Sequence, residues 1–213
     1  METRDLIARL SSNISAIDFD AASTRLSRAS IIGLGGNTAL LIVLFDIRSD
    51  MPQLMLTAMF WIRLAFPLAT IVAAINLVER LGRPGARLKL AWLATALPIV
   101  SILSAAIVVL FATPPGYRLQ LMLGTTWKGT TADIVILSSP SLLAVMHTMK
   151  GLAPTRPVVT GAAVGLLAGA EGVLVYTLYC SEMSVPFWSV WYLLAILATA
   201  GVAAAIAPRY LKW

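Results

Sequence analysis

The chain has 213 residues, of which 59% are hydrophobic and only 12% are charged, and its mean hydropathy is +0.85. A water-soluble domain carries about 25% charged residues and rarely exposes large apolar patches. This composition therefore excludes an ordinary soluble fold and indicates a membrane protein whose first partner is the lipid bilayer. The net charge of +6 does not predict direct nucleic-acid binding, because the basic residues lie between apolar runs.

The chain contains one cysteine and one histidine. A single cysteine excludes an intrachain disulfide, and a single histidine excludes a heme held by two histidines of this chain. His147 follows Ser138 and Ser139, but no glycine-flanked serine accompanies it, so the sequence does not predict a serine hydrolase. We therefore expect neither an enzyme nor a resident cofactor.

The first 28 residues form the only sizeable polar segment. Within it, Leu6, Ile7, Leu10 and Ile14 fall on one face of a predicted short helix. About twelve residues make a marginal helix in water, so we expect this segment to fold only against another surface. That surface is either a groove on a cytosolic partner or the membrane and the bundle's own loops.

Six apolar runs follow, and a helix of about 20 residues crosses a bilayer core. The fourth run is the shortest, and Pro140 predicts a kink in it. The expected spans are residues 29–45, 54–78, 90–111, 134–149, 158–179 and 187–207. We therefore expect an all-α, polytopic bundle of six transmembrane helices over residues 29–213, preceded by a separate domain at residues 1–28.

The distribution of Lys and Arg predicts the orientation of this bundle, because cytoplasmic loops carry an excess of basic residues. With the N-terminus inside, the inside segments hold twelve basic residues: Arg4, Arg9, Arg25, Arg28, Arg80, Arg83, Arg87, Lys89, Lys150, Arg156, Arg209 and Lys212. The outside loops hold three: Arg48, Arg118 and Lys128. Both termini are therefore expected in the cytoplasm. The outer span ends carry an expected aromatic belt: Trp61, Trp188, Trp191 and Tyr192.

Two ionisable residues lie within predicted spans, Arg63 in the second and Glu171 in the fifth. A charge at that depth is costly, so both should face the protein interior, water or a partner. One interpretation is an ion pair between them, and another is that Glu171 is protonated. Asn37 is expected to form a hydrogen bond between helices.

Two further features of the fifth span are notable. Gly161, Gly165 and Gly169 recur every four residues and predict close helix packing, within the bundle first and in a homodimer second. Cys180 lies at the predicted outer end of this span, near Glu182. There it could be oxidised, join an interchain disulfide or bind a metal with Glu182, unless it is only a small packed residue.

Several stretches along the chain carry a family resemblance. They are residues 5–10, 77–85, 137–142, 152–157 and 208–213, and most specifically residues 162–192, which include Cys180-Ser181-Glu182. In these stretches the chain resembles the NrsF-type membrane anti-sigma factors of proteobacteria. The resemblance spans nearly the whole length.

The resemblance implies a protein of the bacterial inner membrane that sequesters an extracytoplasmic-function sigma factor through its cytoplasmic N-terminal segment. Leu6, Ile7, Leu10 and Ile14 would be the contact residues. It also implies release on a periplasmic stress signal, a heavy metal or an oxidant.

The same resemblance implies two periplasmic cysteines. Cys180 matches the second, but residues 127–133, where the first would fall, contain none. An intrachain disulfide switch is therefore excluded, and Cys180 would act through a metal, an interchain disulfide or sulfenic acid.

A rival hypothesis is a small transporter or channel that uses Glu171 in the middle of the membrane. The absence of internal sequence repeats argues against it.

Overall fold

A computed structural model describes residues 19–45, 50–83, 86–152 and 154–211. In these ranges every regular element is helical, and six helical segments are long and apolar enough to cross a bilayer. The expected all-α class and the six spans are thereby confirmed. The long helices outside the fourth span are α2 (Phe19–Leu44), α4 (Ala58–Leu81), α5 (Lys89–Ala112), α9 (Pro157–Tyr176) and α11 (Leu193–Tyr210).

The fourth span departs most from the sequence prediction. Instead of residues 134–149, it comprises Pro115–Lys150, divided into α6 (Pro115–Leu123), α7 (Trp127–Leu137) and α8 (Ser139–Lys150). The interruption between α7 and α8 lies next to Pro140, which has no N–H to donate and disfavours a continuous helix. Polar and glycine residues in α6 and early α7 lower the local hydropathy, so the predicted span omits them.

The first span also begins earlier than predicted. Helix α2 starts at Phe19, and Ser23 Oγ donates a hydrogen bond of 2.6 Å to the Glu79 carboxylate of α4. Leu26 is buried as well. These tertiary contacts stabilise a helical turn whose polar composition alone does not indicate a span. The predicted boundary between residues 28 and 29 therefore lies inside one continuous helix.

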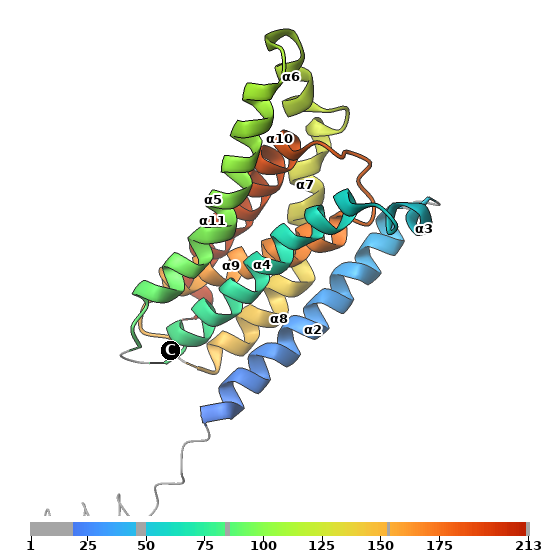
Figure 1. Cartoon of the computed structure of the whole chain (residues 1–213). Coiled ribbons are helices and arrows are strands. Elements are labelled where there is room, and N and C mark those ends of the chain that lie inside the picture. The colour runs from blue at the N-terminus through green and yellow to red at the C-terminus, as the bar shows by residue number, and fades with distance from the viewer. Residues whose placement is uncertain (1–18, 46–49, 84–85, 153, 212–213) are drawn as a thin grey trace, which may run out of the picture.

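Helix α9 occupies the centre of the bundle. It contacts α2, α4, α7, α8 and α11, and nearly all its residues from Thr160 to Tyr176 are buried (Figure 1). Short elements, α3 (Met51–Leu54), α10 (Val185–Phe187) and the π-helical turn η1 (Trp188–Tyr192), complete the end that faces away from the C-terminus. A helix enclosed on all sides can carry polar groups that lipid would not tolerate.

The glycine ridge of α9 faces α11. A methyl group added at Gly161, Gly165 or Gly169 would lie within 2.9 Å of a backbone atom of α11. The two backbones therefore approach each other more closely than side chains at these positions would permit. Because α11 of the same chain occupies the ridge, the ridge is not free to pack against a second copy.

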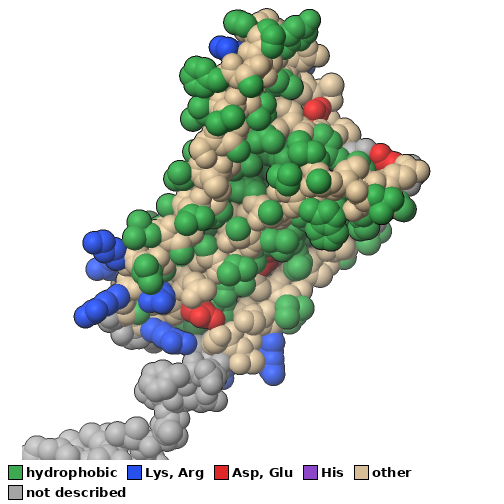
Figure 2. Space-filling view, viewed as in Figure 1, with side chains coloured by type: hydrophobic (Ala, Val, Ile, Leu, Met, Phe, Trp, Pro, Cys, Tyr) green, Lys and Arg blue, Asp and Glu red, His purple; other side chains and the backbone are tan. Residues whose placement is uncertain are grey.

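The basic residues gather at one end of the molecule. Most Lys and Arg side chains in Figure 2 lie at the end that holds the start of α2, the α4–α5 connection and the C-terminal end, while apolar side chains cover the body. The opposite end is formed by α3, α6 and the α9–α10 connection. The bundle is thus strongly asymmetric in charge along its length.

Gly165→Ala should lower the free energy of unfolding by about 1–3 kcal/mol, because the added methyl forces two backbones apart. The measurement is thermal unfolding of the detergent-solubilised protein. Gly201→Ala is the matched control, since its methyl would meet no atom within 4 Å, and it should be neutral or slightly stabilising. Equal losses in both variants would contradict this packing.

Candidate functional site

Arg63 of α4 organises the end of the bundle away from the basic residues. It is 2% exposed, and its Nη1 donates to the Cys180 carbonyl oxygen at 2.9 Å, while its Nη2 donates to the Tyr192 hydroxyl at 2.6 Å. Its guanidinium carbon also lies 5.7 Å from the ring centroids of Trp188 and Tyr192. A buried charge requires such hydrogen bonds and ring contacts to offset its desolvation. We call Arg63, Cys180, Trp188 and Tyr192 the arginine cluster.

Two sequence expectations are corrected by this cluster. Arg63 does not form an ion pair with Glu171, because its Nη groups bind Cys180 and Tyr192 instead. Trp188 and Tyr192 do not belong to an aromatic belt, since they are fully buried around Arg63. Trp61, by contrast, is 61% exposed and fits a belt position.

Cys180 is enclosed rather than accessible. Its residue is 2% exposed, its N–H donates to the Tyr176 carbonyl at 3.0 Å, and its side chain is hydrogen-bonded to that of Tyr192. Of the two alternatives for Cys180, a reactive thiol or a small packed residue, this burial favours the packed residue in this conformation. A reagent can reach the sulfur only after the surrounding contacts open.

Glu182 holds the α6–α7 turn. Its Oε1 accepts hydrogen bonds from the Thr125 N–H at 2.7 Å and the Thr125 hydroxyl at 2.6 Å. Gly124 precedes Thr125 with a φ of 58°, and a side chain there would collide with Glu182 and Phe187 at 2.8 Å. Glycine meets both the backbone and the space requirement. Within the described residues, no group of three His, Cys, Asp or Glu side chains could hold a metal around Cys180 and Glu182.

Glu171 lies in a second polar cluster, between α9, α2 and α8. It is 2% exposed, its Oε1 accepts a hydrogen bond from the Ser30 hydroxyl, and Ser141 lies beside it. Asn37 Oδ1 accepts the Ser141 N–H at 3.1 Å, so Asn37 forms the expected interhelical bond and satisfies a backbone donor in the first turn of α8. The sequence reasoning identified Glu171 and Asn37 but missed Ser30 and Ser141. Serines are common in helices and carry no signal of their own.

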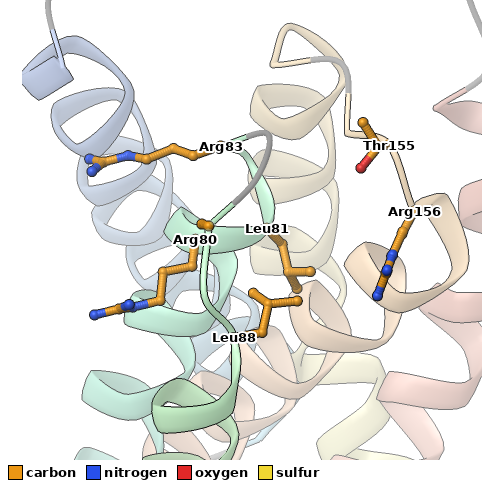
Figure 3. Close-up of a pocket in the computed structure, with 7 residues that line it drawn as sticks. Arg80, Leu81, Arg83, Leu88, Thr155 and Arg156 are labelled. Carbon is orange, nitrogen blue, oxygen red and sulfur yellow. The ribbon is translucent and has the colours of Figure 1, made fainter.

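The basic end has a shallow cavity of about 270 Å³ beneath the α4–α5 connection. Figure 3 shows Leu81 and Leu88 at its centre, with Arg80 and Arg83 extending to one side and Arg156 on the other. Arg80 Nη1 donates to the Arg87 carbonyl at 3.2 Å. The guanidinium groups therefore spread the positive charge over the surface and do not converge on one ligand.

The remaining expected site residues, Leu6, Ile7, Leu10 and Ile14, lie outside the described residues. The nearest described backbone is the start of α2 at Phe19. Among the expected residues whose positions are described, the structure brings Cys180 and Arg63 together. It places Glu171 in the second polar cluster, with Ser30 and Ser141.

Comparison with known proteins gives consistent results. The family model "NrsF: Negative regulator of sigma F" matches residues 10–213. Over the full length of both chains, this chain is 37% identical to the "Probable anti-sigma-F factor NrsF" of Azospira oryzae. It is 32% identical, again over both full lengths, to the "Anti-sigma-F factor NrsF" of Caulobacter vibrioides. No solved structure matches the chain.

Arg63→Gln should raise the rate at which a maleimide labels Cys180 by about five-fold to about 160-fold. That range corresponds to the cost of about 1–3 kcal/mol for leaving buried polar groups unpaired. Because the chain has one cysteine, the mass shift of the intact protein reports this site alone.

Arg118→Gln is the control for that labelling experiment. Arg118 bonds only locally among the described contacts, to the Thr113 carbonyl at 3.0 Å, so its loss should leave the labelling rate unchanged. If Arg63→Gln labelled no faster than the wild type, the arginine cluster would not be what encloses the thiol.

Proposed function

Since the chain belongs to the NrsF family, the negative regulators of sigma F, we propose that it holds an extracytoplasmic-function sigma factor inactive at the bacterial inner membrane. As a member of this family it is an anti-sigma factor, a regulator and not an enzyme, and its partner is a sigma factor. The N-terminal residues that precede α2 lie in the cytoplasm and bind that partner. A periplasmic stress signal releases it.

The charge asymmetry supports the proposed orientation. Basic residues follow the cytoplasmic side of membrane proteins because they are retained there during insertion. The end that carries most Lys and Arg also carries the start of α2 and the C-terminal end of the chain (Figure 2). An inner-membrane protein inserted by this rule has both termini in the cytoplasm, where a sigma factor is found.

The apolar face of Leu6, Ile7, Leu10 and Ile14 supports sigma-factor binding by the N-terminal segment. Amphipathic helices of this kind dock into apolar grooves on partner proteins. The segment continues directly into α2, which packs on α8 and α9 and bonds to α4 through Ser23. A movement of α2 relative to the bundle would therefore move the sigma-binding segment as well.

One observation carries the proposed release: α9 joins both ends of the bundle. Its middle binds α2 through Glu171 and Ser30, and its outer end leads into Cys180 and the arginine cluster. A signal that opens this cluster would disturb α9 and, through Glu171, the helix that carries the sigma-binding segment. A shift from 1:99 to 99:1 between two states requires about 5.5 kcal/mol, more than one hydrogen bond supplies.

The transporter alternative has weaker support. Glu171 is buried and bound to Ser30 of α2, with Ser141 of α8 beside it. Family membership favours a regulator. Ion flux in proteoliposomes that is lost in Glu171→Gln would favour transport instead.

The double substitution Leu6→Asp/Leu10→Asp should abolish sigma-factor binding and raise expression from a sigma-dependent reporter to the level of a strain without this protein. The physical reason is that two carboxylates cannot enter an apolar groove without partners. Co-purification from membranes measures binding, and the reporter measures the consequence.

Ala8→Asp/Ser12→Asp is the matched control, because it adds the same charge to the opposite face of the predicted helix. It should retain binding and repression. If both pairs of substitutions released the sigma factor equally, net charge rather than an apolar face would explain the effect. If neither did, the N-terminal segment would not be the sigma-binding element.

A further inference from the structure

A groove of about 680 Å³ runs between α2 and α8 at the basic end of the bundle. From α2, its lining includes Arg25, Arg28 and Ile32, at spacings that place them on one helix face. From α8, it includes Leu143 and His147, again one turn apart. Two helix faces therefore contribute to one continuous depression.

The two helices run in opposite directions through this region. Gly33 of α2 faces Ser141 of α8, and Gly36 faces Pro140, so the numbering falls on one helix as it rises on the other. In Figure 1 the start of α2 and the end of α8 lie at the same end of the molecule. The start of α2 and the end of α8 therefore line the same end of the groove, and both helices can be followed from that end inward.

Along the groove, the polar and charged side chains lie at the end of the bundle, and the apolar side chains lie deeper. Arg25, Arg28 and His147 are exposed at the end of the groove, whereas Ile32 and Leu143, each 70% exposed, lie about one turn deeper. Along a helix, one turn is about 5.4 Å. The groove thus presents two arginine side chains and an imidazole at headgroup depth, and large apolar side chains where acyl chains begin.

We propose that this groove binds one anionic phospholipid. Its phosphate is held by Arg25 and Arg28, with His147 beside them, and one acyl chain lies along Ile32 and Leu143. Basic pockets between transmembrane helices at the cytoplasmic side bind anionic headgroups in this way. The groove opens sideways at exposed Ile32 and Leu143, which in a bilayer face lipid, so a lipid rather than a soluble anion matches both halves. The inference needs only a membrane-spanning bundle and does not rest on the proposed function.

The test is native mass spectrometry of the full-length protein in detergent, titrated with phosphatidylglycerol or with phosphatidylcholine. The wild type should bind phosphatidylglycerol more tightly. Arg25→Gln/Arg28→Gln should weaken that binding about five-fold for each arginine removed, the ratio expected from about 1 kcal/mol per basic residue. Its binding of phosphatidylcholine, whose headgroup has no net charge, should weaken less, so the preference for phosphatidylglycerol should fall.

The matched control is Arg87→Gln/Arg209→Gln, which removes two exposed arginines from the same end outside this groove. It should bind phosphatidylglycerol as the wild type does. Leu143→Trp narrows the groove without changing its charge and should also weaken phosphatidylglycerol binding. This variant tests the proposal if the arginine variant fails to fold. Equal weakening in both arginine pairs, unchanged binding in Leu143→Trp, or no preference in the wild type would each overturn the proposal.

Discussion

The close approach of α9 to α11 is the constraint on which the rest of the bundle depends. In a bilayer the hydrophobic effect does not drive helices together, so association relies on van der Waals packing and interhelical hydrogen bonds. The glycines of α9 supply the first by removing side chains from the contact. With α11 close on one side and α2, α4, α7 and α8 on the others, α9 is withdrawn from lipid. Only then can it carry a carboxylic acid at mid-length.

The polar contacts determine how the other helices are positioned relative to α9. Glu171 joins α9 to α2, Asn37 joins α2 to α8, and Arg63 joins α4 to the segment after α9. Each contact satisfies groups that would be costly to leave unpaired away from water. These bonds are directional, so they set helix register more narrowly than apolar packing does. They also make the bundle a connected network between its basic end and the arginine cluster.

The parts of this structure that sequence can predict are those that depend on composition over a long window. Six spans follow from hydropathy, and the interior positions of Arg63 and Glu171 follow from the cost of charge in lipid. Their partners do not follow, because the Cys180 carbonyl and the Ser30 hydroxyl lie 117 and 141 residues away in sequence. The first turns of α2 cannot be predicted from the sequence either, since they depend on the contact of Ser23 with Glu79. Burial of Trp188 and Tyr192 overturned a belt prediction that rested only on their position near a span end.

The arginine cluster also constrains how a chain with one cysteine could respond to its surroundings. The stretch where the family resemblance implies another cysteine forms the first half of α7, and it packs against the same end. There the Tyr176 hydroxyl donates to Thr130 at 3.3 Å, and Trp127 lies 5.6 Å from Trp191 between ring centroids. The backbone carbonyl of Tyr176 in turn accepts a hydrogen bond from the Cys180 N–H. In this chain, hydrogen bonds and ring contacts therefore connect the first half of α7 with the segment that contains Cys180. Chemistry at Cys180 must follow an opening of this end, so the sensitivity of the thiol depends on the stability of the contacts around Arg63 as much as on the sulfur itself.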